Sequence, residues 1–271
     1  MSQVESTRTG RRDSEAPPRV ARWTWIVVLV VGIVLFELVR RTLVATQNPN
    51  FLPSLILLGA AVVPAAFLTF VASRRLPTDL GSGPIVVAAL LGGVIGTVVA
   101  GTLEYDAMQR LGGLPMLAVA LIEEAAKLII PAAMLAVARF RHGPANGLVL
   151  GVASGAGFAA LETMGYALTV LVQTRGNIAA VDGELLLRGL LSPAAHMAWT
   201  GLTAAALWRW TRLGHGLWWF LGTYVVAVVL HTVWDSVGGL IVYVVLAIVA
   251  FTLLILTTHR LGRAPTGSEA R

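Results

Sequence analysis

The chain has 271 residues, of which 56% are hydrophobic and 13% charged, and its mean hydropathy is +0.78. Soluble domains usually carry about 25% charged residues, so the composition excludes an ordinary soluble enzyme and predicts an all-α, polytopic membrane protein. The net charge of +6 does not indicate nucleic-acid binding, because the basic residues stand in short flanks of apolar runs, where they set orientation. The chain has no cysteine, which excludes disulfides, thiolate metal ligands and a cysteine nucleophile.

Eight apolar runs of near-membrane length predict a bundle of about eight transmembrane helices. The runs are 23–39, 51–72, 84–103, 114–138, 145–172, 185–208, 216–236 and 238–258. Residues 23–259 are therefore read as one transmembrane domain, with no internal repeat, between a disordered tail of residues 1–22 and a tail of residues 260–271. The first run lacks a small-residue cleavage site and is interpreted as a retained helix. The segment 173–184 is predicted as the only sizeable outer loop, and Gly238–Gly239 as a tight hairpin between the last two helices.

The arginines predict that both termini are cytoplasmic and that the protein spans the plasma membrane, since cytoplasmic flanks collect basic residues. In that orientation the inner segments carry Arg8, Arg11, Arg12, Arg19, Arg22, Arg74, Arg75, Arg139, Arg141, Arg209, Arg212, Arg260, Arg263 and Arg271, and the outer ones Arg40, Arg41, Arg110, Arg175 and Arg188. Arg40 and Arg41 fit least well, and we expect them at the interface, ion-paired with Glu37.

The fourth run contains the sequence LIEEAAKLIIP, which places Glu123, Glu124 and Lys127 within an apolar helix. One ionisable residue at the bilayer centre costs roughly 2.5–3.5 kcal/mol on insertion scales, so three of them need a reason. Both carboxylates can reach Lys127, which lies four and three positions further on. The group is either an internal salt bridge or a catalytic carboxylate with its neighbours. Pro131 lacks an N–H and is expected to leave the carbonyl of Lys127 unpaired.

The fifth run carries a row of small residues that leads to a carboxylate. Gly147, Gly151 and Gly155 recur at four-residue spacing and Ala159 continues the row, which lets helix backbones approach closely. Glu162 lies two turns after Gly155 on nearly the same face. The pattern therefore predicts a carboxylate in a close helix contact; the alternative is a protonated Glu that hydrogen-bonds a neighbouring helix.

The sixth and seventh runs contribute imidazoles. His196 follows Pro193, which is expected to bend its helix. His231 and Asp235 are one turn apart and share a face. Taken singly, His196 fits a hydrogen-bonded packing residue, and His231 with Asp235 fits a neutralising pair near the interface.

The depths of these residues favour one shared site. In the predicted orientation Glu123, Glu162, His196 and His231 all fall in the middle or outer half of the bilayer, within roughly 10 Å. Carboxylates and imidazoles can activate water directly or hold a zinc ion that acidifies bound water. The set therefore predicts a hydrolase; spacing indicates no Ser–His pair, and a second aspartate for an aspartyl dyad is missing from the spans.

Four motifs in order resemble those of the PrsW family of intramembrane proteases. Glu123-Glu124-Ala-Ala-Lys127 is similar to its EExxK motif and Phe158-Ala-Ala-Leu-Glu162 to its FxxxE motif, while His196 matches its lone span histidine and His231-Thr-Val-Trp-Asp235 its HxxxD-type motif. The resemblance covers roughly residues 110–240. The family is related to the CPBP/Abi group, whose type II prenyl endopeptidases tend to show EExxxR and FxxxH instead. Thr163 departs from the Asn expected after the glutamate, which bears on substrate positioning.

The resemblance implies cleavage of a membrane-spanning protein substrate near its extracytoplasmic end, such as an anti-sigma factor, within the lipid bilayer and without nucleic acid. The roles we predict are a general base for Glu123, tuning of that base by Glu124 and Lys127, and orientation of His231, or a further metal ligand, for Asp235. Metal binding, with Zn²⁺ the expected ion, or direct oxyanion stabilisation is predicted for Glu162, His196 and His231. Whether a metal is needed stays open.

Two functions of other classes stay open at this point. Buried acids could relay protons or cations in a transporter, although many transporters are built from repeats and none is evident here. The bundle could also be a non-catalytic scaffold that binds helices.

Overall fold

The computed structural model describes residues 22–74, 76–113, 115–137 and 143–263, and regular structure in these ranges is entirely helical. The elements are α1 (Thr24–Thr46), the 3-10 turn η1 (Pro49–Phe51), α2 (Leu52–Ala72), α3 (Ser82–Leu111), α4 (Met116–Ala136), α5 (Pro144–Gln173), α6 (Ile178–Leu213), α7 (Leu217–Val237) and α8 (Leu240–Arg263). The all-α prediction is confirmed. The tail predicted for 1–22 lies outside the described residues apart from Arg22, as do Arg75, Arg139, Arg141 and Arg271, whereas α8 continues into the segment predicted as the C-terminal tail.

Five of the helices are long and apolar enough to cross a membrane, so the chain is a multi-pass membrane protein. They span Pro49–Ala72, Ser82–Leu111, Pro144–Gln173, Leu217–Val237 and Leu240–Gly262. Of the other three, α1 carries Glu37, Arg40 and Arg41 together in its second half, and α4 carries Glu123, Glu124 and Lys127 in its middle. The count of eight spans and the cytoplasmic termini remain predictions.

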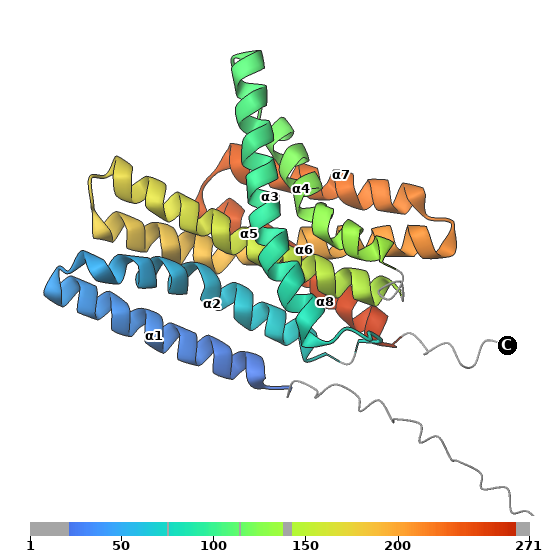
Figure 1. The fold of residues 1–271 in the computed structure, drawn as a ribbon, viewed down its shortest axis with the longest axis horizontal. Coiled ribbons are helices and arrows are strands. Elements are labelled where there is room, and N and C mark those ends of the chain that lie inside the picture. The colour runs from blue at the N-terminus through green and yellow to red at the C-terminus, as the bar shows by residue number, and fades with distance from the viewer. Residues whose placement is uncertain (1–21, 75, 114, 138–142, 264–271) are drawn as a thin grey trace, which may run out of the picture.

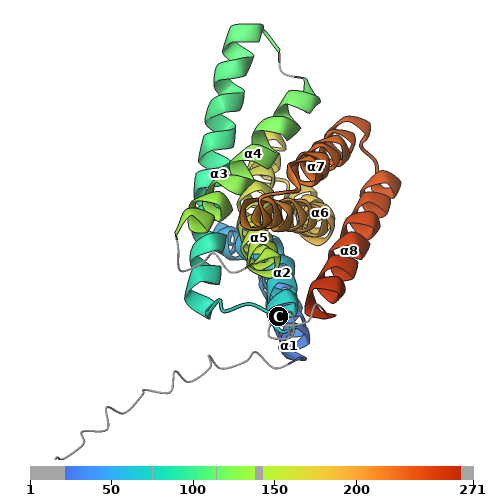
Figure 2. The same ribbon diagram turned by 90° about the vertical axis from the view of Figure 1, so that its right-hand side faces the viewer.

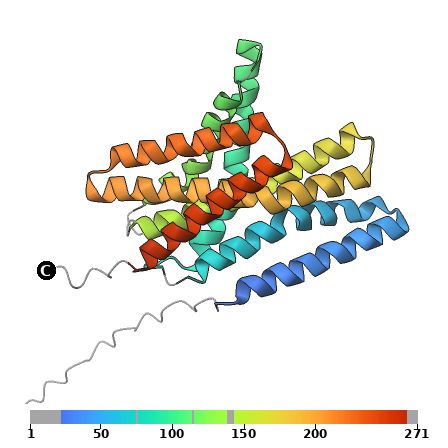
Figure 3. The ribbon, with the colours of Figure 1, turned by 180° about the vertical axis from the view of Figure 1, so that it is seen from behind.

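The hairpin of α5 and α6 forms the centre of the bundle, with the other helices around it (Figures 1 and 2). Every residue from Ala145 to Ala156 of α5 is buried. The pair α1 and α2 lies along one side, and α8 runs obliquely across α6 on the face seen from behind (Figure 3). The exception to the common direction is α3, which crosses α5 steeply and projects, with the start of α4, beyond the rest of the bundle (Figure 1).

The row of small residues predicted in α5 produces its close contact with α6. A Cβ atom added to Gly147 would lie 2.6 Å from the carbonyl oxygen of Ala204. Added to Gly151 or Gly155, it would lie 2.5 Å from the oxygen of Thr200 or 2.6 Å from that of His196. Such distances leave no room for any side chain, so the predicted close helix contact is confirmed.

The carbonyl that Pro131 releases in α4 has a specific partner. Ser154 Oγ of α5 donates a hydrogen bond of 2.7 Å to the Lys127 carbonyl oxygen. This bond satisfies a backbone carbonyl that could not hydrogen-bond to water inside the bilayer. It also fixes the turn of α4 that carries Lys127 against α5.

Two connections test the predicted loops. The outer loop predicted for 173–184 is wrong in length, because Asn177 Oδ1 accepts a hydrogen bond of 3.2 Å from the Ala180 N–H and α6 begins at Ile178. The tight hairpin is confirmed, since Gly238 and Gly239, with φ of 65° and 89°, are all that separate α7 from α8.

Candidate active site

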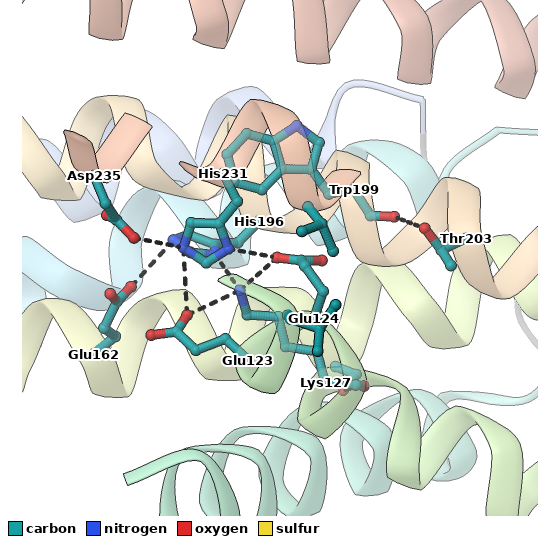
Figure 4. A network of polar contacts seen from close by, with 12 residues as sticks. Glu123, Glu124, Lys127, Glu162, His196, Trp199, Thr203, His231 and Asp235 are labelled. Carbon is teal, nitrogen blue, oxygen red and sulfur yellow. Dashed lines mark hydrogen bonds and ion pairs between the residues drawn. The ribbon is translucent and has the colours of Figure 1, made fainter. Parts of the chain in front are cut away.

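Polar side chains from α4, α5, α6 and α7 meet in one buried cluster (Figure 4). Lys127 is 0% exposed, His196 and His231 are each 1% exposed, and Glu124 is 2% exposed. Glu162 and Asp235 lie at its more open edge. The structure therefore brings together all seven residues that the sequence singled out.

Lys127 lies at the middle of the cluster. Its Nζ is 2.8 Å from Glu124 Oε1 and 3.2 Å from Glu123 Oε2, which are the two intrahelical pairs that the spacing predicted. The same Nζ is 2.7 Å from His196 Nδ1. The ammonium also stands 4.3 Å from the centre of the Phe158 ring, whose face attracts a cation.

The contacts of His196 indicate which of its nitrogens carries the proton. An ammonium group has only donors, so His196 Nδ1 accepts the hydrogen bond from Lys127. The proton of a neutral ring is then on Nε2, which lies 3.1 Å from Glu162 Oε2. Glu162 thus acts on the side of His196 that faces away from Lys127.

His231 is surrounded by carboxylates. Its Nδ1 is 2.9 Å from Glu124 Oε1, and its Nε2 is 3.3 Å from Asp235 Oδ2 and 3.5 Å from Glu123 Oε2. Carboxylates only accept hydrogen bonds, so both ring nitrogens are placed to donate to oxygen or, at Nε2, to bind a cation instead.

Trp199 of α6 packs against both imidazoles and was not singled out by the sequence. Its ring centre is 5.2 Å from that of His231 at 30°, and 5.6 Å from that of His196 at 67°. Trp199 follows His196 by three positions, so the aromatic neighbour on the same helix was the available signal. The indole therefore packs beside both histidine rings.

Arg188 is the charged residue that sequence reasoning misplaced. We assigned it to an outer loop, but it lies in α6 with its side chain only 11% exposed. Its Nη2 is 2.7 Å from Glu162 Oε1, and its guanidinium stands 3.7 Å from the centre of the Tyr166 ring. The predicted run 185–208 contained both Arg188 and His196, and their spacing of eight would have placed them near one face.

Three of the clustered residues fit a metal ion. Glu123, His196 and His231 each offer one ligand atom, and these atoms lie within 4.8 Å of one another. Two imidazoles and a carboxylate form a common catalytic zinc set that keeps a position open for water. Glu123 Oε2 is buried and receives no well-formed hydrogen bond among the described residues, which suits an atom that has an unused bonding capacity. The group contains Glu123, whereas the sequence motifs predicted Glu162 as the carboxylate ligand.

Comparison with known proteins gives one match. A family model described as PrsW family intramembrane metalloprotease covers residues 82–257, from α3 to α8. No curated protein and no solved structure matches the chain. Because the matched region is more than half of the chain and contains all seven clustered residues, this protein is a protease that belongs to the PrsW family of intramembrane metalloproteases.

Proposed function

We propose that this protein hydrolyses a peptide bond in a membrane-spanning protein substrate, close to the extracytoplasmic face of the plasma membrane. The observation that carries the proposal is the convergence of Glu123, His196 and His231, from three helices, on one point shielded from lipid. Family membership supports the chemistry. A membrane-anchored anti-sigma factor is the substrate class that the family resemblance suggests.

We propose that Glu123, His196 and His231 hold the metal ion, and Zn²⁺ is the ion whose ligand preferences they meet. When bound, such an ion lowers the pKa of a coordinated water and polarises a substrate carbonyl. The carboxylates outside this trio then orient the ligands. Glu162 Oε2 lies 3.1 Å from His196 Nε2 and Glu124 accepts from His231 Nδ1, and carboxylates placed in this way commonly fix the tautomer of metal-binding histidines.

The decisive experiment compares Glu123→Gln with Glu162→Gln in the purified full-length protein. We expect Glu123→Gln to abolish cleavage of a membrane-anchored reporter substrate and to lose the metal, because it removes a ligand. We expect Glu162→Gln to keep a metal but to bind it about 10–100-fold more weakly, the usual effect of removing an orienting carboxylate. Cleavage by Glu123→Gln at the wild-type rate would refute the assignment.

The remaining outcomes separate the mechanisms left open by the sequence. A Glu123→Gln variant that is inactive yet retains its metal would make Glu123 the general base and return Glu162 to the ligand set. Wild-type protein that still cleaves after chelation, with no metal by elemental analysis, would favour a metal-free reaction in which Glu123 takes a proton from water. Glu37→Gln, in the ion pair with Arg40, serves as the control that should cleave normally.

The substrate is found with the same variant. Proteomics of membrane fractions from cells that carry the wild-type protein or Glu123→Gln should show a membrane protein that accumulates intact only with the variant. If the wild-type protein cuts this substrate on its cytoplasmic side, the proposed position of cleavage is wrong.

A further inference from the structure

Lys127 already occupies the donor group that would hold the metal. Its Nζ is 3.2 Å from Glu123 Oε2 and 2.7 Å from His196 Nδ1, so it contacts two of the three proposed ligands. Its third close contact, at 2.8 Å, is Glu124 Oε1. The ammonium carries a positive charge and lies within 3.2 Å of all three groups, so the lysine occupies the position of a metal cation among them.

A metal ion and this ammonium cannot share these donors. Metal binding at Glu123 and His196 uses the carboxylate oxygen that now faces the Lys127 ammonium and the Nδ1 lone pair that now accepts its hydrogen bond. His196 has little to offer elsewhere, because its Nε2 faces Glu162. Two cations a few ångströms apart also repel strongly where water cannot screen them, and Lys127 is fully buried.

We infer that Lys127 is a built-in competitor of the metal ion. Its ammonium holds Glu123 and His196 together in the metal-free protein and must leave both for an ion to bind. Glu124 is outside the donor trio and contacts Lys127 directly, so it gives the displaced ammonium a partner to keep. This inference rests on the proposed metal site at Glu123, His196 and His231, and it adds that loading of that site is opposed by a residue of the same helix as Glu123.

The test is an equilibrium metal titration of the full-length protein in detergent, after removal of metal by a chelator. Co²⁺ is added first, because its visible absorption reports binding to nitrogen and oxygen ligands, and Zn²⁺ affinity is then obtained by competition. The variants are Lys127→Met, which keeps the length of the side chain and removes its charge, and Lys127→Arg, which keeps the charge. We expect Lys127→Met to bind Zn²⁺ at least about tenfold more tightly than wild type, and Lys127→Arg to show no gain.

Several results would overturn the inference. One is a Zn²⁺ affinity of Lys127→Met that is equal to or weaker than that of wild type. Another is an equal gain in affinity in Lys127→Met and Lys127→Arg, which would indicate an effect of packing and not of charge. The third is that neither wild type nor variants bind the metal. If thermal unfolding shows that Lys127→Met is not folded, Lys127→Gln is used in its place. The glutamine amide carries no charge but can still donate hydrogen bonds to Glu124 and His196.

Cleavage is measured separately from affinity, so the two hypotheses fail in different ways. If the wild-type protein cleaves its substrate but Lys127→Met binds Zn²⁺ no more tightly, the competition by Lys127 is refuted and the proposed proteolysis stands. If Lys127→Met binds Zn²⁺ more tightly but the wild-type protein shows no proteolysis, the competition by Lys127 is supported and the proposed reaction is refuted.

Discussion

Each of the two buried histidines is held by the same series of contacts, built from different helices. Arg188 contacts Glu162, which contacts His196; Lys127 contacts Glu124, which contacts His231. In both series a cation holds a carboxylate, and the carboxylate fixes one nitrogen of an imidazole. Burying such charges is costly unless every member is paired, so the ion pairs are what allow a Glu–His centre to exist inside a membrane bundle.

Arg188→Met should destabilise the protein and weaken catalysis, because it leaves Glu162 buried without its cation. Loss of one partner of a buried ion pair costs about 3 kcal/mol or more, and Glu162 would then no longer be held toward His196. Thermal unfolding in detergent and reporter cleavage measure the two effects. Arg41→Met is the matched control, since the Arg41 side chain is 76% exposed and should matter little. Equal stability of the two variants would show that the Arg188–Glu162 contact is unimportant.

The sequence predicts contacts within one helix far better than contacts between helices. The pairs of Lys127 with Glu123 and Glu124 follow from spacing alone, and they form. The pair of Arg188 and Glu162 joins two helices, so spacing along the chain carries no trace of it. Arg188 fell inside the predicted run 185–208, but the positive-inside reasoning counted it among the outer arginines instead of placing it in the bundle.

At the scale of the elements, α5 sets the positions of its neighbours with two adjacent residues. Gly155 lets the backbone of α6 approach at His196, and Ser154 bonds the backbone of α4 at Lys127. Both contacts are to main-chain atoms, which cannot move without moving a whole helix. The relative position of His196 and Lys127, 2.7 Å apart at their nitrogen atoms, therefore depends on this one turn of α5.

Gly155→Ala should disrupt the site from a position that makes no contact with a catalytic atom. The new Cβ would lie 2.6 Å from the His196 carbonyl oxygen, so α6 must move away, and overpacking of this kind costs about 1–3 kcal/mol. We expect lower thermal stability and a large loss of cleavage. Gly165→Ala on the same helix is the control, because its Cβ would meet no described atom within 4 Å, and removing a helical glycine gains about 0.5–1 kcal/mol. If both variants behave alike, the close contact does not position His196.

The small-residue row of α5 was predictable, but the course of α3 was not. Hydropathy gives a helix its length and says nothing of its tilt. The structure shows α3 crossing α5 steeply, where a Cβ atom on Gly93 would lie 2.7 Å from the carbonyl carbon of Gly157 (Figure 1). Gly92, Gly93 and Gly96 mark this crossing in the sequence, and their contact with α5 becomes evident only once the fold is known.

At the scale of the whole molecule, the family match and the site define a bundle of α3 to α8, to which α1 and α2 are added. Arg40 of α1 pairs with Glu37, as predicted, and stands 3.6 Å from Asp182 at the start of α6. This contact lies at the end of the bundle where α5 and α6 join. The added helices thus reach the same end of the bundle as the loop between α5 and α6, which the arginine distribution predicts to face the outside.

That orientation decides near which face of the membrane the substrate is cleaved. It can be measured with introduced cysteines because the chain has no native cysteine. Thr174→Cys lies in the loop between α5 and α6, and His215→Cys in the loop between α6 and α7; both positions are exposed. With cytoplasmic termini and eight spans, the first is extracytoplasmic and the second cytoplasmic. A membrane-impermeant thiol reagent added to intact cells should therefore label Thr174→Cys at once and His215→Cys only after the membrane is permeabilised. The reverse pattern would invert the bundle and place the proposed cleavage near the cytoplasmic face, and equal labelling of the two would show that α6 does not cross the membrane.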